Sequence, residues 1–362
     1  MRALLFAAFL LASVLTGCHK GRDRSKEPCG GVDLLPRPDD VALAGPWPVG
    51  ARTVRAGELV LEVWYPARVG SERGRGTLRY DLREAMPADE AAKIPDGDNV
   101  WLESAAFRDL PLDDTHGPYP VVLFLHGAAS FRAQSAFLAT HWASRGFVVI
   151  APDLPGVGLG DVLRGTTSFP MGVPSTVFEL ITRPPPEPDP LAFVRARIAP
   201  RIGVVGHSLG AVLSGTLGNR PELAVRIAMA GTAAPDGDAS TTIVVGDRDG
   251  IAPPPAGPPV PGTRLAIVHG AGHLGFTDLC LVGADRGGAL AIARARGVNV
   301  PEMIATLATD GCRPADAPFA ATAPVIRAVT AAALEERLHC GRDANQVLGG
   351  RAGLTWIDER AR

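Results

Sequence analysis

The sequence predicts an α/β domain in which a mostly parallel β-sheet is flanked by helices. Short, continuous apolar runs recur along the chain, and segments of helix length or long turns separate most of them. Such runs suit strands that are covered on both faces, and strands that alternate with helices favour parallel pairing. The runs lie at residues 121–125, 147–150, 202–205, 227–230, 243–245 and 265–268.

An earlier segment predicts a strand of a different kind. Residues 58–65 (ELVLEVWY) alternate apolar and polar side chains, which is typical of a half-buried strand. An antiparallel strand at the edge of an otherwise parallel sheet is common, so we expect residues 58–65 to form such an edge.

The first 17 residues have the pattern of a secretory signal. Met1 and Arg2 precede an apolar run that is too short to span a bilayer. Residues 15–18 (LTGC) resemble the lipobox of bacterial lipoproteins, whose cysteine is acylated and becomes the first residue. We therefore expect an exported lipoprotein of the cell envelope, anchored through Cys18 to a periplasm-facing membrane or the cell surface. An ordinary cleaved signal that contains a cysteine is the alternative.

The rest of the chain divides into a tether and one domain. Residues 18–48 carry Gly, Pro and charge without periodicity, which predicts a flexible tether, and residues 49–362 form the predicted domain. A formal net charge of −2, with no stripe of Lys and Arg, excludes a nucleic-acid partner.

Without Cys18, four cysteines remain, an even number that suits disulfides in an exported protein. They are Cys29, Cys280, Cys312 and Cys340. Three pairings are possible, and we favour Cys280 with Cys312 because both flank one excursion of the chain. None of the spacings resembles a zinc site, so no metal is expected.

Residues 206–210 (GHSLG) follow a predicted strand and precede a segment rich in small residues. Glycines on both sides of Ser208 allow the sharp strand-to-helix turn that exposes a nucleophilic serine. A serine hydroxyl needs a base, and in such proteins an acid and then a histidine follow it along the chain. The alternative is a plain turn serine.

Two carboxylates compete for the role of the acid, because Asp247 and Asp249 both follow the strand at residues 243–245. Hydrolases with this type of turn commonly show Gly, two residues, then Asp before a small-apolar-Pro stretch. Asp249 fits this spacing and Asp247 does not, so we assign Asp249 as the acid and Asp247 as a turn cap.

Three histidines compete for the role of the base. His273 ends a glycine-rich loop at the carboxyl edge of the predicted sheet, where catalytic groups gather in α/β folds. His269 lies at the end of the strand itself, and His207 belongs to the sharp turn beside Ser208. We therefore assign His273 as the base and give the other two structural roles.

A tetrahedral intermediate also needs hydrogen-bond donors that are fixed in advance. Residues 125–129 (LHGAA) follow a buried strand and resemble an oxyanion loop of the HG type. The backbone N–H groups of Ala128 and Leu209 are the natural pair of donors. The alternative is that His126 and Gly127 form a simple tight turn.

Four stretches resemble bacterial relatives of platelet-activating-factor acetylhydrolase, a branch also described as predicted dienelactone hydrolases and related to polyester-cleaving cutinases. These are residues 63–67 (VWYPA), 124–127 with 131–132, 149–153 with 155–156, and 206–210. With the acid and histidine loops, the resemblance covers about residues 48–276. It implies an α/β-hydrolase fold and ester hydrolysis through an acyl-enzyme, without metal or organic cofactor. Dienelactone hydrolases proper use a cysteine where this chain has Ser208, which argues against lactone chemistry. Asp153, a loop residue in that family, is expected to be structural.

Two further segments lie between and after these motifs. Residues 159–197 form an insertion before the nucleophile strand, which predicts either a lid or a helix packed on the sheet. Its apolar residues are Phe169, Met171, Val173, Val177, Phe178 and Leu180. Residues 277–362 form a C-terminal extension without a recognisable relative. Within it, residues 324–340 predict a helix whose Val325, Val329 and Ala333 face the sheet.

The sequence thus predicts a serine hydrolase of short-chain or lipid-like carboxylic esters. A peptidase or an acyltransferase with the same residues is one alternative. A non-catalytic surface-binding module of the same fold is another, and the complete set of serine, acid, histidine and HG loop argues against it.

Overall fold

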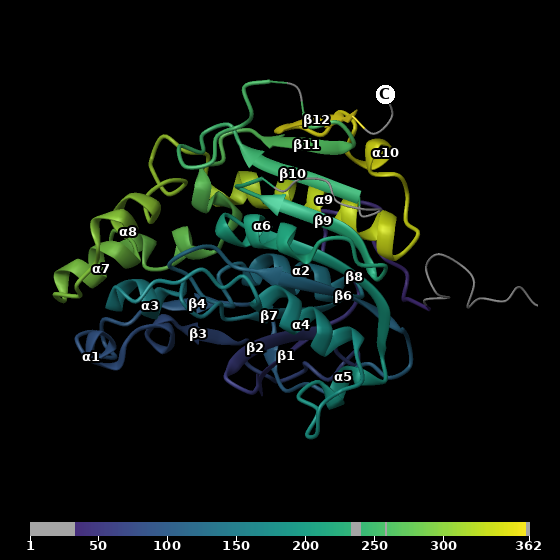
Figure 1. The fold of residues 1–362 in the computed structure, drawn as a ribbon, viewed down its shortest axis with the longest axis horizontal. Helices are drawn as coiled ribbons and strands as arrows, with labels where there is room; N and C mark the ends of the chain where they lie inside the picture. The colour runs from purple at the N-terminus through teal and green to yellow at the C-terminus, as the bar shows by residue number, and fades with distance from the viewer. Residues whose placement is uncertain (1–32, 233–239, 258, 360–362) are drawn as a thin grey trace, which may run out of the picture.

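The computed structural model describes residues 33–232, 240–257 and 259–359 (Figure 1). The described residues contain a ten-stranded sheet with the order β12-β11-β10-β9-β8-β6-β7-β2-β1-β5. Its strands are β1 (Val49–Ala56), β2 (Leu59–Pro66), β5 (Phe107–Arg108), β6 (Tyr119–Leu125), β7 (Val148–Pro152), β8 (Ile198–His207), β9 (Leu223–Met229), β10 (Ser240–Gly246), β11 (Thr263–Val268) and β12 (Leu354–Asp358). A separate two-stranded sheet pairs β3 (Arg79–Asp81) with β4 (Trp101–Glu103).

The centre of the large sheet is parallel, as predicted from the six apolar runs. Strands β7, β6, β8, β9, β10 and β11 pair in parallel, whereas β2 and β12 each pair antiparallel to the parallel block. The predicted strand at residues 58–65 corresponds to β2, but it is not the edge. Strands β1 and β5 lie beyond it, because a two-residue turn folds β1 back along the full length of β2.

Helices cover both faces of the sheet, because alternate side chains of each buried strand point to opposite sides. On one face, α2 (Ala136–Ser144), α9 (Phe319–Leu338) and α10 (Ala344–Leu348) share a core with Val122 and Phe124 of β6. On the other face, α4 (Val173–Thr182), α5 (Ala192–Arg195) and α6 (Leu209–Ser214) pack near Val121 and Leu123.

The C-terminal helix agrees with the sequence pattern. Helix α9 begins five residues before the predicted residue 324, and Val325, Val329 and Ala333 are all buried in the core beneath the sheet. The described part of the chain contains no helix with the length and apolarity needed to cross a membrane.

The folded part of the chain begins before residue 49. Trp47 is buried, and its indole N–H donates a hydrogen bond to Asp113 at 2.6 Å. Val41 and Ala42 are also buried in the core. The described end of the predicted tether therefore packs on the domain, whereas residues 1–17, Cys18 and Cys29 lie outside the described residues.

Helix α4, in the predicted insertion, packs on the sheet instead of covering the carboxyl edge. Its Val177, Phe178 and Ile181 are buried against the sheet face, while Phe169 and Met171 before it are exposed. Of the two interpretations of residues 159–197, a lid or a helix packed on the sheet, the helix packed on the sheet is the one that describes α4.

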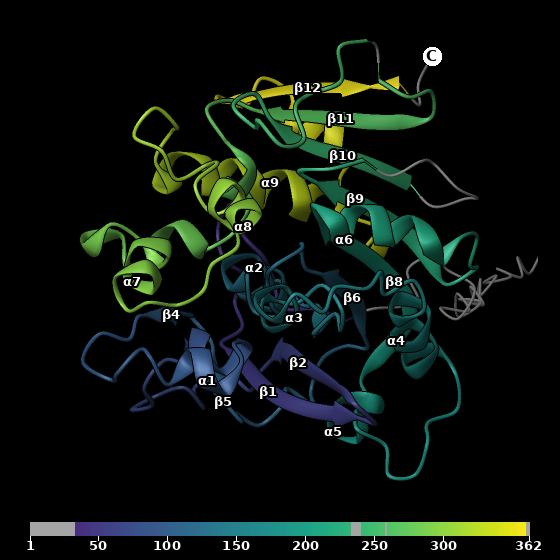
Figure 2. The ribbon, with the colours of Figure 1, turned by 60° about the vertical axis from the view of Figure 1, so that its left-hand side comes forward.

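Other segments gather beyond the carboxyl ends of the strands (Figures 1 and 2). They include α1 (Ala88–Ala91), α3 (Leu159–Arg164), α7 (Ala289–Ala295) and α8 (Glu302–Leu307). Their apolar side chains form a separate small core, which contains Ile94, Val162, Leu163, Val298 and Ile304. We call residues 82–100 and 279–314 the cap. From the sequence, only residues 159–197 are considered as a lid over the carboxyl edge of the sheet. Apart from α3, the segments that cover this edge come from other parts of the chain.

A disulfide closes the C-terminal part of the cap. Cys280 and Cys312 are bonded, with their Cα atoms 5.2 Å apart, which confirms the favoured pairing. Cys340 is also disulfide-bonded.

Candidate active site

Ser208 lies at the sharp turn between β8 and α6. Its backbone has φ 54° and ψ −118°, a conformation that costs energy in a residue other than glycine. Gly206 and Gly210 are required here, because a Cβ on either would lie 2.1 Å from a backbone oxygen, of Gly210 or of Leu125. The turn holds the Ser208 side chain above the end of the strand, as the glycine pattern predicts.

Three side chains predicted to act together meet at this turn. The Ser208 hydroxyl donates to His273 Nε2 at 2.9 Å. The opposite ring nitrogen, Nδ1, donates to Asp249 Oδ2 at 3.0 Å. Because Asp249 accepts a hydrogen bond from Nδ1–H, the proton of the neutral ring is on Nδ1 and the lone pair of Nε2 faces the hydroxyl. A general base requires this arrangement.

Asp249 is held in its ionised form by its surroundings. Burial acts to raise its pKa, but the hydrogen bond and charge of His273 and the backbone N–H groups of Ala252 and Ile251 outweigh burial and lower the pKa below its usual value. Those two N–H groups donate to Oδ1 at 2.7 and 2.8 Å. The buried carboxylate therefore stabilises a positive charge on His273.

The rival residues lie elsewhere. Asp247 is exposed and accepts the N–H of Gly270 at 2.6 Å, as expected of a loop cap. His269 is exposed and bonds to Thr355 of β12. The structure thus brings Asp249 and His273 to Ser208 and leaves Asp247 and His269 outside.

His207 packs beneath the imidazole of His273. Its Nε2–H donates to the carbonyl oxygen of His273 at 3.0 Å, and the two rings lie 5.0 Å apart. Burial, followed by the neighbouring His273, lowers the pKa of His207 to about 3. His207 is therefore neutral near pH 7 and supports the histidine loop from below.

The HG loop presents backbone donors beside Ser208. The N–H groups of Ala128 and Leu209 have no acceptor within the described part of the chain. Gly127 approaches the serine closely, because a Cβ on it would lie 3.2 Å from Ser208 Cβ. The two predicted donors are thus unengaged, as an oxyanion site requires.

His126 and Gln134 fix the shape of this loop. Buried His126 donates from Nδ1 to the Gly127 oxygen at 2.7 Å and accepts the Leu154 N–H at 2.9 Å, which defines its neutral tautomer. Gln134 accepts the N–H of Gly127 at 3.0 Å. Sequence reasoning missed Gln134, since a lone glutamine in a loop carries no pattern.

Asp153 has the structural role that the resemblance implies. Its Oδ1 accepts the backbone N–H of Arg132 at 2.9 Å, and its Oδ2 pairs with the guanidinium of the same residue at 2.7 Å. These bonds anchor the segment that follows the HG loop.

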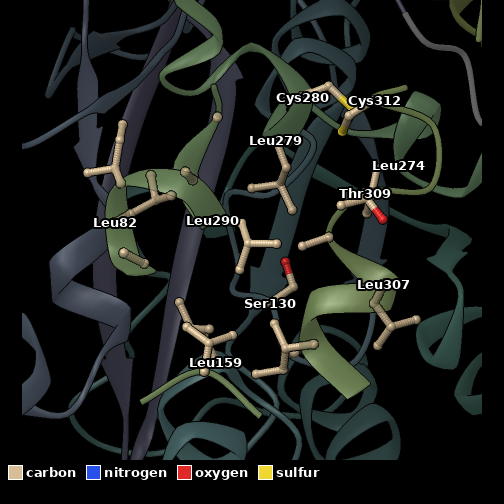
Figure 3. A pocket seen from close by; sticks show the side chains of 18 of the residues that line it. Leu82, Ser130, Leu159, Leu274, Leu279, Cys280, Leu290, Leu307, Thr309 and Cys312 are labelled. Atoms are coloured by element: carbon tan, nitrogen blue, oxygen red, sulfur yellow. A yellow bond between two sulfur atoms is a disulfide. The ribbon is translucent and has the colours of Figure 1, made fainter. Parts of the chain in front are cut away.

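A cavity of about 570 Å³, within the range of small-molecule sites, opens above Ser208 and His273. Figure 3 shows side chains that line it. Its walls are largely apolar and come from the cap, α3 and the HG loop. Leu159, Leu279 and Leu290 point into it in the close-up. The disulfide between Cys280 and Cys312 forms part of the wall.

Comparisons with known proteins agree with this architecture. A family model described as "Alpha/beta hydrolase family" matches residues 122–269, which include Ser208 and Asp249. The chain is similar to the solved structure of a ferulic acid esterase from Streptomyces cinnamoneus, with 18% identity and a TM-score of 0.59, over 88% of this chain and 99% of that one. A search of curated proteins found no match. The fold is the α/β-hydrolase fold, as predicted.

Proposed function

We propose that this chain is a serine hydrolase of carboxylic esters that acts through an acyl-enzyme. The observation that carries the proposal is the hydrogen-bonded series from Ser208 through His273 to Asp249, at the floor of an apolar cavity. The family match and the fold of a ferulic acid esterase support hydrolysis of an ester.

The chemistry follows from the geometry. His273 Nε2 takes the proton of Ser208 as the serine oxygen attacks the ester carbonyl. The N–H groups of Ala128 and Leu209 stabilise the oxyanion, and His273 then passes its proton to the departing alkoxide. Water, activated by the same imidazole, hydrolyses the acyl-enzyme and frees the acid. Asp249 orients the ring and stabilises its charged form throughout.

The cavity supports a substrate with an apolar portion. Each methylene that leaves water contributes about 0.8 kcal/mol of binding, and the walls beside Ser208 are mostly leucine, isoleucine, valine and alanine. Within the class of short-chain or lipid-like esters, this favours esters whose acyl or alcohol part fills the space under the cap.

The finer relationship and the location are part of the same proposal. The stretches around Ser208 and Asp153 resemble the platelet-activating-factor acetylhydrolase branch. The Cys280–Cys312 disulfide suits an oxidising compartment and so supports export. We infer anchorage through an acylated Cys18 from residues 15–18 alone.

A test of the activity compares the protein lacking residues 1–18 with its Ser208→Ala variant on p-nitrophenyl esters of increasing acyl length. The parent should hydrolyse them and bind a fluorophosphonate covalently, and the variant should do neither. A folded parent that neither turns over any ester nor reacts with the fluorophosphonate would refute the proposal and favour a binding module.

A further inference from the structure

The carboxylate of Asp310, in the C-terminal extension, lies between the two loops that carry Asp249 and His273. Its Oδ1 accepts the backbone N–H of His273 at 2.8 Å, and its Oδ2 accepts the backbone N–H of Gly250 at 3.0 Å. Its carbonyl oxygen accepts the N–H of Leu274 at 2.8 Å. Asp310 is buried, so these bonds are shielded from water.

The surrounding backbone is built for this contact. A Cβ on Gly250 would lie 2.8 Å from Asp310 Oδ2, and a Cβ on Gly272 would lie 2.7 Å from Oδ1. Gly311, at φ 97°, follows Asp310, and its Cβ would lie 2.7 Å from the backbone nitrogens of Leu274 and Gly275. Glycines thus allow the three segments to approach as closely as the carboxylate requires.

We propose that Asp310 is a positioning residue that sets the separation of Asp249 and His273; this inference rests on the proposed ester hydrolysis. One of its oxygens holds the residue that follows Asp249, and the other holds His273 itself. Its carboxylate bonds to backbone groups and not to the imidazole ring. Asp310 does not contact the reacting atoms, so it acts on catalysis through the placement of the other two residues.

The same residue links the active site to the cap. Asp310 lies two positions before Cys312, whose disulfide with Cys280 closes the cap segment. Arg313 pairs with Asp310 at 3.4 Å and donates to the Arg248 oxygen at 2.9 Å. The carboxylate is thus anchored from the cap side, so the segment that walls the cavity also holds the acid and histidine loops.

Kinetics of Asp310→Ala, Asp310→Asn and Asp343→Asn test this role. Asp343 is the matched control, because its carboxylate also accepts a backbone N–H, that of Asn345 at 2.7 Å, but caps the distant helix α10. Misplacement of reacting groups by about 1 Å costs roughly 100-fold, so kcat of Asp310→Ala should fall by about that factor while KM changes little. The kcat of Asp310→Asn should lie between those of the parent and of Asp310→Ala, since the amide oxygen of Asn accepts one N–H and its NH₂ group faces the other. Asp343→Asn should retain the kcat of the parent.

Amide hydrogen exchange provides a readout that does not need turnover. The N–H groups of Gly250 and His273 should exchange faster in Asp310→Ala than in the parent, and those of α10 should not. The inference is overturned if kcat of Asp310→Ala stays within threefold of the parent, if Asp343→Asn loses as much, or if the two amides exchange at unchanged rates. A parent without esterase activity whose two amides lose protection in Asp310→Ala would retain the positioning role and refute only the ester hydrolase.

Discussion

The Nε2 atom of His273 lies 2.9 Å from the Oγ atom of Ser208, although 65 positions separate the two residues along the chain. Strands β8 and β11 end at the same edge of the parallel sheet, and the loops after them deliver both side chains there. The carboxyl edge of a parallel sheet therefore assembles a nucleophile and a base from distant segments.

Substitution of Asp249 and Asp247 in turn should show which of the two is the catalytic acid. Asp249→Asn loses the carboxylate that orients His273, and a comparable change in a known serine protease lowers kcat about 10⁴-fold. Asp247→Asn changes an exposed loop cap, so its kcat should stay within about threefold of that of the parent. Hydrolysis of p-nitrophenyl butyrate measures both, and equal losses in the two variants would contradict the assignment of Asp249.

A larger side chain in the cavity should shorten the preferred acyl chain. Leu290 of α7 points into the cavity, so Leu290→Trp removes the space of about two methylenes. At about 0.8 kcal/mol per methylene, kcat/KM for decanoyl esters should fall about 10- to 100-fold relative to acetyl esters. Leu281→Trp, at a residue 51% exposed on the same segment, is the control. A uniform loss for all chain lengths would show that the acyl group lies elsewhere.

Loss of the cap disulfide should lower stability. The bond joins cysteines 32 positions apart, and closure of a loop of this size stabilises a protein by about 3–4 kcal/mol. The double variant Cys280→Ser/Cys312→Ser should therefore unfold at lower urea concentration than the parent. Substitution is needed because a reductant would also open the disulfide of Cys340. An unchanged midpoint would contradict this prediction.

His141 should make the protein less stable at acidic pH. Burial, followed by the charges of Arg327 and Arg145, lowers the pKa of His141 to about 3. Below a pH of about 6.5, the pKa of histidine in the unfolded chain, His141 is protonated in the unfolded chain but stays neutral in the folded protein. The free energy of unfolding therefore falls by up to about 1.4 kcal/mol for each unit by which the pH is lowered. This loss runs from about pH 6.5 down to about pH 3.

The variant His141→Gln should show a shallower fall in that window, measured by urea unfolding at several pH values. Gln can still donate to the Val41 oxygen that His141 Nε2–H contacts at 2.9 Å. Parallel pH profiles for parent and variant would exclude His141 as a source of the acid sensitivity.

The sequence alone determined the parallel core, the turn at Ser208 and the residues that compete to assist it. These features are local, because apolar runs mark buried strands and the glycines around Ser208 allow only one kind of turn. The pairing of Cys280 with Cys312 was also predictable, since both cysteines flank one excursion.

Only the tertiary structure decided which segments cover the site and what holds its loops together. Helix α4 packs on the sheet because its apolar side chains are buried against one face of the sheet, whereas residues 82–100 and 279–314 form the cap. Asp310 acts through the backbone N–H groups of His273 and Gly250, which lie 37 and 60 positions away in the chain, and Gln134 holds the N–H of Gly127 within its own loop. Such contacts depend on where folded loops meet, and a side chain that binds a distant backbone group leaves no periodicity or spacing in the sequence.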